Sequence, residues 1–156
     1  VMTLPNPEKP IEDEWVAAIA EAVGEPDEET FFVTHSLGGM AVLRYLERLP
    51  EGRRIGGLVM VAGFSEWNFR PESYNCFEVP LDYKKVCRTI SRSTIVIQSK
   101  NDPFVKPYAG HVETLRKWLG AEVRTVKDGG HFTNTKEDDR WGELPIALDA
   151  LNTLMS

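Results

Sequence analysis

Cysteines are few in this sequence, and basic tracts and long apolar runs are lacking. Only two of its 156 residues are cysteines, and the spacing of Cys76 and Cys87 fits neither a disulfide framework nor a metal site, so we expect small, semi-buried thiols. The net charge is −6 and no basic tract occurs, which argues against a nucleic-acid-binding protein. No apolar run approaches membrane-spanning length and no signal-peptide pattern opens the chain, so a cytoplasmic location is the expectation.

The rest of the composition is that of an ordinary globular protein. Hydrophobic residues make up 42% of the chain and charged residues 27%, which is enough apolar material for a sizeable core at this length. The sequence shows no internal repeat and no sign of a second domain. We therefore predict one domain that spans residues 1–156.

Apolar patterning predicts strands and helices that alternate along the chain. Continuous or β-branched apolar runs predict buried strands, and a shorter alternating run predicts an edge strand. This alternation is typical of a three-layer α/β/α sandwich with a mostly parallel sheet, whose ligands bind along the edge formed by the carboxyl ends of the strands. The predicted strands are 31–33, 55–62, 94–98 and 122–126, and the predicted helices are 11–23, 40–48, 82–90, 107–119 and 144–155.

Ser36 lies between the first predicted strand and the helix that follows it. A serine in such a turn, with small residues around it, is typical of the nucleophile elbow of α/β-hydrolases. The residues two positions to either side must be small because strand and helix cross there. Gly38 meets this condition, whereas Thr34 stands where glycine is usual. The alternative is a serine that only caps an ordinary helix.

Asp102 and His131 follow the third and fourth predicted strands, at the same edge of the sheet as Ser36. The order Ser, Asp, His is that of the α/β-hydrolase triad. His131 could act as general base, and Asp102 could fix its tautomer and stabilise its imidazolium. Asp128 is the rival acid, but it lies only three residues before His131 in the same loop. Alternatively, Asp102 forms only a turn and His131 is a plain loop residue.

Four other features carry weaker expectations. We expect His35 to point away from the elbow tip in a packing role, and His111 to face solvent. The acidic cluster 137–139 is interpreted as a solvated loop, because no histidine or cysteine at ligand spacing supports a metal site. The aromatic segment 63–80 could cover a substrate pocket or merely pack onto the domain.

Several stretches along essentially the whole chain carry a family resemblance, and they occur in family order. They are Leu4-Pro5-Asn6-Pro7 with Trp15, Val33-Thr34-His35-Ser36-Leu37-Gly38, Leu58–Ala62, Ser99–Val105 and Gly130–Thr135. In these stretches the chain resembles the small serine-hydrolase family that includes bacterial YdeN and retinoblastoma-binding protein nine. The resemblance implies an α/β-hydrolase fold and a triad of Ser36, Asp102 and His131. It also implies activity on esters or related acyl substrates, with the backbone N–H of Leu37 as one oxyanion donor.

The chain departs from this family at its start. The family begins with a further strand and loop, whereas this chain opens at what resembles the family's second strand, so we expect a minimal, N-terminally incomplete form. Residues 31–35 would then lack a strand partner on one side, which invites association. A second oxyanion donor would also be missing, and one such donor is typically worth about 10²- to 10³-fold in rate. A strand from another chain, or residues 1–4 moving inward, would be alternatives.

The sequence thus favours a carboxylesterase-like serine hydrolase that needs no metal or cofactor. Its expected partner is a small-molecule acyl substrate, with no nucleic acid and no membrane. The alternative is a catalytically impaired hydrolase fold that binds a protein through the aromatic loop 64–77, or that forms a homo-oligomer.

Overall fold

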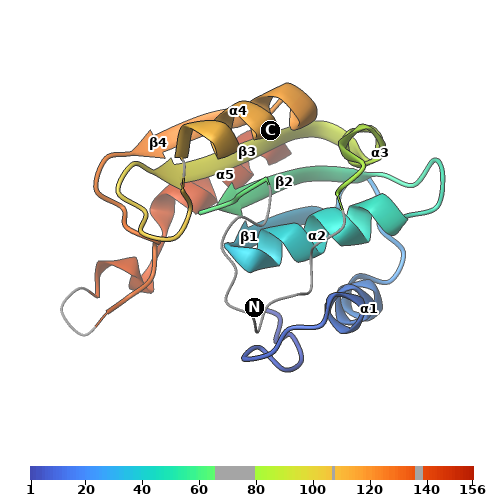
Figure 1. Cartoon of the computed structure of the whole chain (residues 1–156). Coiled ribbons are helices and arrows are strands. Elements are labelled where there is room, and N and C mark those ends of the chain that lie inside the picture. Colours follow the sequence, from blue (N-terminus) through green and yellow to red (C-terminus); the bar gives the residue numbers. More distant parts are fainter. Residues whose placement is uncertain (66–79, 107, 136–138) are drawn as a thin grey trace.

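The computed structural model describes residues 1–65, 80–106, 108–135 and 139–156. Within these residues, four strands form one parallel sheet whose strand order follows the chain order (Figure 1). The strands are β1 (Phe31–His35), β2 (Ile55–Val61), β3 (Ile90–Ser99) and β4 (Glu122–Val126). The helices are α1 (Glu12–Val23), α2 (Leu37–Arg48), α3 (Tyr83–Arg88), α4 (Tyr108–Leu119) and α5 (Pro145–Met155), with a short 3-10 helix at Arg140–Gly142.

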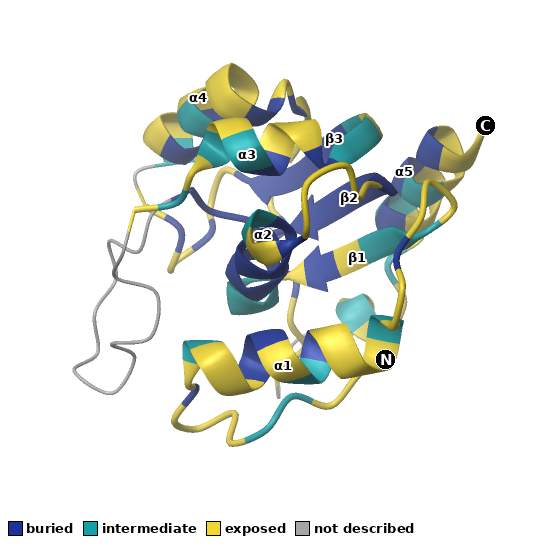
Figure 2. Cartoon of the chain, turned by 90° about the vertical axis from the view of Figure 1, so that its right-hand side faces the viewer, coloured by how far each residue is buried: buried dark blue, intermediate teal, exposed yellow. Residues whose placement is uncertain are grey.

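The order of the strands explains which helices cover which face. Each crossover from β1 to β4 moves one strand along the sheet in the same direction, and right-handed crossovers of this kind place α2, α3 and α4 on one face. The chain changes face only after β4, so α5 packs on the opposite face (Figure 1). α1 lies beside α2, near the β1 edge (Figure 2). The predicted three-layer α/β/α sandwich with a parallel sheet is confirmed.

The alternation of side chains along the central strands divides the core into two clusters. Leu58 and Met60 of β2 face α2 and α4, whereas Val59 and Val61 face α5. All seven residues of β2 are buried, as its continuous apolar run predicts. Burial at the centre of the sheet holds the carboxyl ends of the strands in fixed positions, and the candidate functional residues follow those ends.

Most predicted elements are confirmed, and the differences have local causes. β3 begins at Ile90, inside the helix predicted for 82–90, because Ile90 pairs with Ile55 of β2. No strand forms at residues 1–4, so the expectation of a family second strand there is wrong. The chain is instead held just after this segment, where Nε1–H of the Trp15 indole donates to the carbonyl of Pro5 at 2.7 Å.

Two further expectations concern β1 and the cysteines. β1 pairs with β2 and with no other described strand, so it is an edge strand, and Val33 within it is 49% exposed. Residues 1–4 do not cover this edge with a strand. Cys87 is an exposed free thiol rather than a semi-buried one, and Cys76 lies outside the described residues.

A buried cation joins α1 to α2, the helix that follows Ser36. The Arg44 side chain is only 3% exposed, and it pairs with Glu12 at 3.2 Å and with Glu47 at 2.8 Å. Arg48, one turn further along α2, pairs with Glu12 and Asp13. These contacts connect α1 firmly to α2, since a buried charge must keep its partners.

Candidate active site

Ser36 occupies a sharp turn between β1 and α2. Its φ of 51° and ψ of −125° lie in a region that non-glycine residues seldom adopt. The turn is held by its own N–H, which donates to the carbonyl of Val61 at 2.9 Å. The Ser36 side chain forms no capping hydrogen bond to α2, so the interpretation as an ordinary helix cap is wrong. This conformation presents the hydroxyl beyond the end of the sheet.

Close packing of helix and strand falls on Gly39 rather than on Gly38. A Cβ atom at Gly39 would lie 3.0 Å from Cε of Met60 and 3.3 Å from Oγ1 of Thr34. At Gly38 a Cβ atom would meet nothing within 4 Å, so our prediction placed the crowding one residue too early. Thr34 is accommodated because its hydroxyl donates to the Val59 carbonyl at 3.2 Å.

The structure brings Ser36, His131 and Asp102 together in one chain of hydrogen bonds. Nε2 of His131 lies 2.9 Å from Oγ of Ser36, and Nδ1 lies 2.8 Å from Oδ2 of Asp102. An ionised carboxylate only accepts, so the neutral imidazole places its proton on Nδ1 and leaves Nε2 free to accept from the serine. This arrangement can remove the proton of the hydroxyl as it attacks a carbon centre.

Asp102 is almost completely buried, yet it is held as a carboxylate. Its side chain is 1% exposed, and Oδ1 accepts the backbone N–H groups of Phe104 at 2.8 Å and Val105 at 3.1 Å. Burial alone would raise the pKa of Asp102, but these bonds and the one from His131 outweigh burial and leave the pKa below its usual value. Asp128, the rival acid, is exposed, and the carboxylate beside His131 is that of Asp102.

The loops that carry Asp102 and His131 are fastened to one another. The Ser99 hydroxyl donates to Oδ1 of Asn101 at 2.6 Å and accepts the Gly129 N–H at 2.8 Å. Oδ1 of Asn101 also accepts the Gly130 N–H at 2.8 Å. Gly130 has a φ of 56°, the left-handed conformation that glycine tolerates best, so the loop can bend sharply just before His131.

Sequence reasoning missed the role of Ser99 and Asn101 in this cross-link. Both residues lie in the stretch that carries the family resemblance, which was the available signal. Their polar groups face the second loop only because β3 and β4 are neighbours in the sheet. Local sequence patterns do not show which strands are neighbours in the sheet.

The expectation for His111 is wrong, and the expectation for His35 is incomplete. His35 has a packing role, as expected, but it packs against His131: its Nε2 is 2.7 Å from the carbonyl oxygen of His131 and the two rings meet edge to face at 4.9 Å. His111 is buried, with only 4% exposure, and its Nδ1 accepts the N–H of Ser65 at 3.3 Å. His111 faces inward because α4 turns that side toward Phe64, whose ring centroid is 6.2 Å away.

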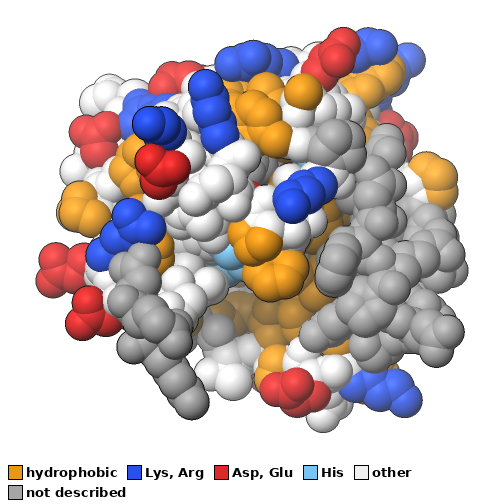
Figure 3. Space-filling view, turned by 60° about the vertical axis from the view of Figure 1, so that its left-hand side comes forward, with side chains coloured by type: hydrophobic (Ala, Val, Ile, Leu, Met, Phe, Trp, Pro, Cys, Tyr) orange, Lys and Arg blue, Asp and Glu red, His pale blue; other side chains and the backbone are white. Residues whose placement is uncertain are grey.

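Leu37 is the first residue of α2, directly after Ser36. The first N–H groups of a helix have no acceptor within the helix, and the positive end of the helix dipole lies there. The predicted oxyanion donor therefore lies at a position suited to developing negative charge. Figure 3 shows a histidine side chain (pale blue) that reaches the surface beside hydrophobic side chains (orange).

Metal-ligating clusters and membrane-spanning helices are both absent from the described part of the chain. It contains no group of three or more His, Cys, Asp or Glu side chains that could hold a metal ion, and no helix long and apolar enough to cross a membrane. Of the acidic cluster 137–139, only Asp139 is described; positions 66–79 of the aromatic segment also lie outside the described residues.

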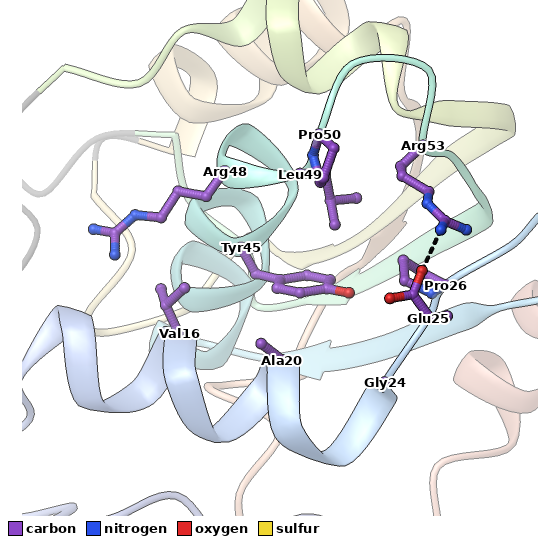
Figure 4. A pocket seen from close by; sticks show the side chains of 10 residues that line it. All are labelled: Val16, Ala20, Gly24, Glu25, Pro26, Tyr45, Arg48, Leu49, Pro50 and Arg53. Atoms are coloured by element: carbon purple, nitrogen blue, oxygen red, sulfur yellow. Dashed lines mark ion pairs between the residues drawn. The ribbon is translucent and has the colours of Figure 1, made fainter.

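A cavity of about 370 Å³ lies between α1 and the C-terminal half of α2 (Figure 4). It is lined by apolar side chains including Val16 and Leu49, and by Tyr45, and the Glu25–Arg53 ion pair borders it. Ser36 lies at the opposite end of α2, so this cavity is separate from the candidate site.

Comparison with known proteins identifies related chains. Residues 2–152 match the family described as serine hydrolase. YdeN of Bacillus subtilis is 31% identical over 157 aligned positions, which cover all of this chain and 80% of YdeN. The serine hydrolase RBBP9 of Rattus norvegicus is 29% identical over 114 residues, covering 70% of this chain and 56% of that protein.

Solved structures include the same relative, YdeN, and a further protein of similar fold. The crystal structure of B. subtilis YdeN matches with a TM-score of 0.85 and 30% identity, over 99% of this chain and 80% of that one. A carboxylesterase from Mesorhizobium loti matches with a TM-score of 0.55 and 16% identity, over 99% of this chain and 68% of that one. The second likeness, at this identity, shows a common fold.

Proposed function

Because this chain belongs to the serine hydrolase family, we propose that it hydrolyses a small acyl ester through Ser36, His131 and Asp102. The observation that carries the proposal is the unbroken chain of hydrogen bonds, 2.9 Å from serine to imidazole and 2.8 Å from imidazole to carboxylate. Each member contributes a property that the others lack: a partly buried hydroxyl in a strained turn, a ring that can exchange protons, and a buried carboxylate.

In the first half of the reaction, Oγ of Ser36 attacks the acyl carbonyl carbon while Nε2 of His131 takes the hydroxyl proton. The imidazolium that forms faces the carboxylate of Asp102, which stabilises its charge. The oxyanion accepts a hydrogen bond from the backbone N–H of Leu37, at the positive end of α2. His131 then returns its proton to the leaving alcohol, and an acyl-serine remains.

In the second half, water attacks the acyl-serine. His131 takes a proton from that water and later gives it to Oγ of Ser36, so that the acid leaves and the free enzyme is restored. In both halves of the reaction Nε2 of His131 exchanges the proton, and Nδ1 faces Asp102. No further group has to move, because the ring already contacts both Ser36 and Asp102 in the resting structure.

The surroundings of the base support an apolar acyl group. The Phe104 ring lies edge to face with the His131 ring at 4.9 Å between centroids, and it is 50% exposed. A half-exposed aromatic ring beside the reacting groups provides a wall that an acyl chain can contact. Short, uncharged esters are therefore the substrates that we propose to examine first.

The experiment is hydrolysis of p-nitrophenyl acetate by the wild type and by the Ser36→Ala and His131→Ala variants. Both variants should lose nearly all activity, whereas Ser156→Ala, a matched serine change at the exposed end of α5, should retain it. Turnover that is equal in the wild type and in both site variants would refute the proposal. That result would favour a hydrolase fold that acts as a protein-binding module.

A further inference from the structure

We propose that His35 is a positioning residue that holds the backbone of His131, so that the base stays aimed at Ser36. The inference rests on the proposed function, because it concerns the same catalytic base. His35 itself neither takes part in proton transfer nor touches the reacting atoms. Its side chain instead contacts the peptide and the ring of the residue that does.

The direction of the His35 side chain follows from strand alternation. Thr34 points toward α2, where its hydroxyl lies near Gly39. Successive residues of a strand point to opposite faces, so His35 points to the face that α5 covers. The connection from β4 to α5 must cross to that face, and it carries His131 past the end of β1. The contact between His35 and this connection is thus a product of the topology.

In the hydrogen bond between His35 and His131, only His35 can be the donor. The carbonyl oxygen of His131 can only accept, so Nε2 of His35, 2.7 Å away, donates. The next residue, Phe132, has a φ of 54°, which is unusual for a bulky side chain. The peptide between His131 and Phe132 is therefore part of a sharp turn, and the bond from His35 fixes its carbonyl end.

Two neighbouring aromatic rings contact the imidazole of His131 and restrict its orientation. The His35 ring meets it at 4.9 Å with an interplanar angle of 65°, and the Phe104 ring meets it at 4.9 Å with an angle of 74°. Edge-to-face contacts of this kind favour a defined ring orientation. Asp102 fixes which nitrogen carries the proton, whereas His35 and Phe104 limit how far the ring can turn.

The charge state of His35 suits this role. Partial desolvation of the ring by its neighbours is the largest influence on the pKa of His35 and lowers it, whereas the hydrogen bond to the His131 carbonyl acts in the opposite direction; the net result is a lowered pKa. His35 is therefore neutral near pH 7. A neutral neighbour does not oppose the positive charge that His131 acquires during catalysis.

Two substitutions separate the hydrogen bond from the ring. His35→Phe keeps an aromatic ring but removes the donor, whereas His35→Gln keeps an N–H donor at a similar distance from the backbone but removes the ring. We expect kcat of His35→Phe to fall about 10- to 100-fold with KM unchanged, since small misplacements of a catalytic group have effects of this size. His35→Gln should recover most of that loss.

The low-field proton resonance of Nδ1–H in His131 provides a readout that does not depend on turnover. We expect it in the wild type and in His35→Gln, and we expect it to broaden or disappear in His35→Phe, because a base with a free carbonyl samples several orientations. Wild-type kcat together with an unchanged resonance in His35→Phe would overturn the inference.

The two proposals fail in different ways. If the wild type does not hydrolyse p-nitrophenyl acetate, the proposed function fails, and the resonance alone then decides whether His35 holds His131. If the wild type is active and His35→Phe matches it in both kcat and resonance, only the positioning role is refuted.

Discussion

Replacing the carboxylate of Asp102 by an amide should inactivate the protein without unfolding it. In Asp102→Asn, the remaining oxygen keeps the two backbone bonds from Phe104 and Val105, because both now go to Oδ1. The new NH₂ group then faces Nδ1 of His131, which was 2.8 Å from the replaced oxygen. Since an NH₂ group only donates, Nδ1 must become an acceptor, and the ring proton moves to Nε2.

The consequence for catalysis is large. With its proton on Nε2, His131 can no longer accept the hydroxyl proton of Ser36, although the 2.9 Å contact is geometrically intact. A tautomer switch of this kind costs about 10⁴-fold in kcat in serine hydrolases with this constellation, which is about 5 kcal/mol of transition-state stabilisation. The free energy of unfolding should fall by no more than about 2 kcal/mol, since charged bonds are replaced by neutral ones rather than lost.

The assay is kcat with p-nitrophenyl acetate, together with urea unfolding of the same samples. Asp128→Asn is the matched control, since it makes the same change at the exposed acid of the neighbouring loop and should leave kcat unchanged. An Asp102→Asn variant within tenfold of the wild type would refute the reasoning, and so would an Asp128→Asn variant that loses activity.

The same substitution has a pH signature. The pKa of Asp102 is lower in the folded than in the unfolded protein, so the unfolded state binds more protons between those two values. The stability that this carboxylate contributes is complete above the unfolded pKa of about 4 and is lost as the pH falls through the folded pKa. The difference in the free energy of unfolding between the wild type and Asp102→Asn should therefore shrink below about pH 4, and a difference that is constant with pH would contradict this.

Two further predictions concern stability and association. Gly38→Ala should raise the free energy of unfolding by up to about 1 kcal/mol, because alanine has the higher helix propensity. Gly39→Ala should raise it less, or lower it, because the new Cβ would lie 3.0 Å from Cε of Met60. Equal effects of the two substitutions in urea unfolding would contradict the packing argument. Val33→Lys should reduce concentration-dependent self-association in sedimentation velocity, because Val33 is 49% exposed on edge strand β1 and lysine blocks edge pairing; unchanged association would show that β1 is not the contact.

The features that were predicted from the sequence are those that local pattern and sheet topology determine. The apolar run before Ser36 and the helical spacing after it locate the turn. The parallel sheet then places the residues that follow the strands at one edge, which is why Asp102 and His131 could be named without coordinates. Strand 122–126 was identified with its observed bounds, because alternation is a clear signal for a half-buried strand.

The features that were missed depend on how distant segments meet. His35 was expected to point away from the elbow tip, and its side chain does leave the α2 face, but the chain returns from β4 on the other side and brings His131 against it. His111 was expected in solvent, yet the inward side of α4 is set by Phe64 and Ser65. Gly39, rather than Gly38, is the residue of closest approach, because crowding depends on the position of Met60 in the neighbouring strand β2.

The measurement that tests the central claim most directly is covalent labelling with a fluorophosphonate probe, followed by mass spectrometry of the labelled peptide. The account predicts one adduct on Ser36 that is absent in Ser36→Ala and strongly reduced in His131→Ala, because the serine is reactive only when the imidazole takes its proton. A folded wild type that is not labelled, or an adduct on another serine, would contradict the account.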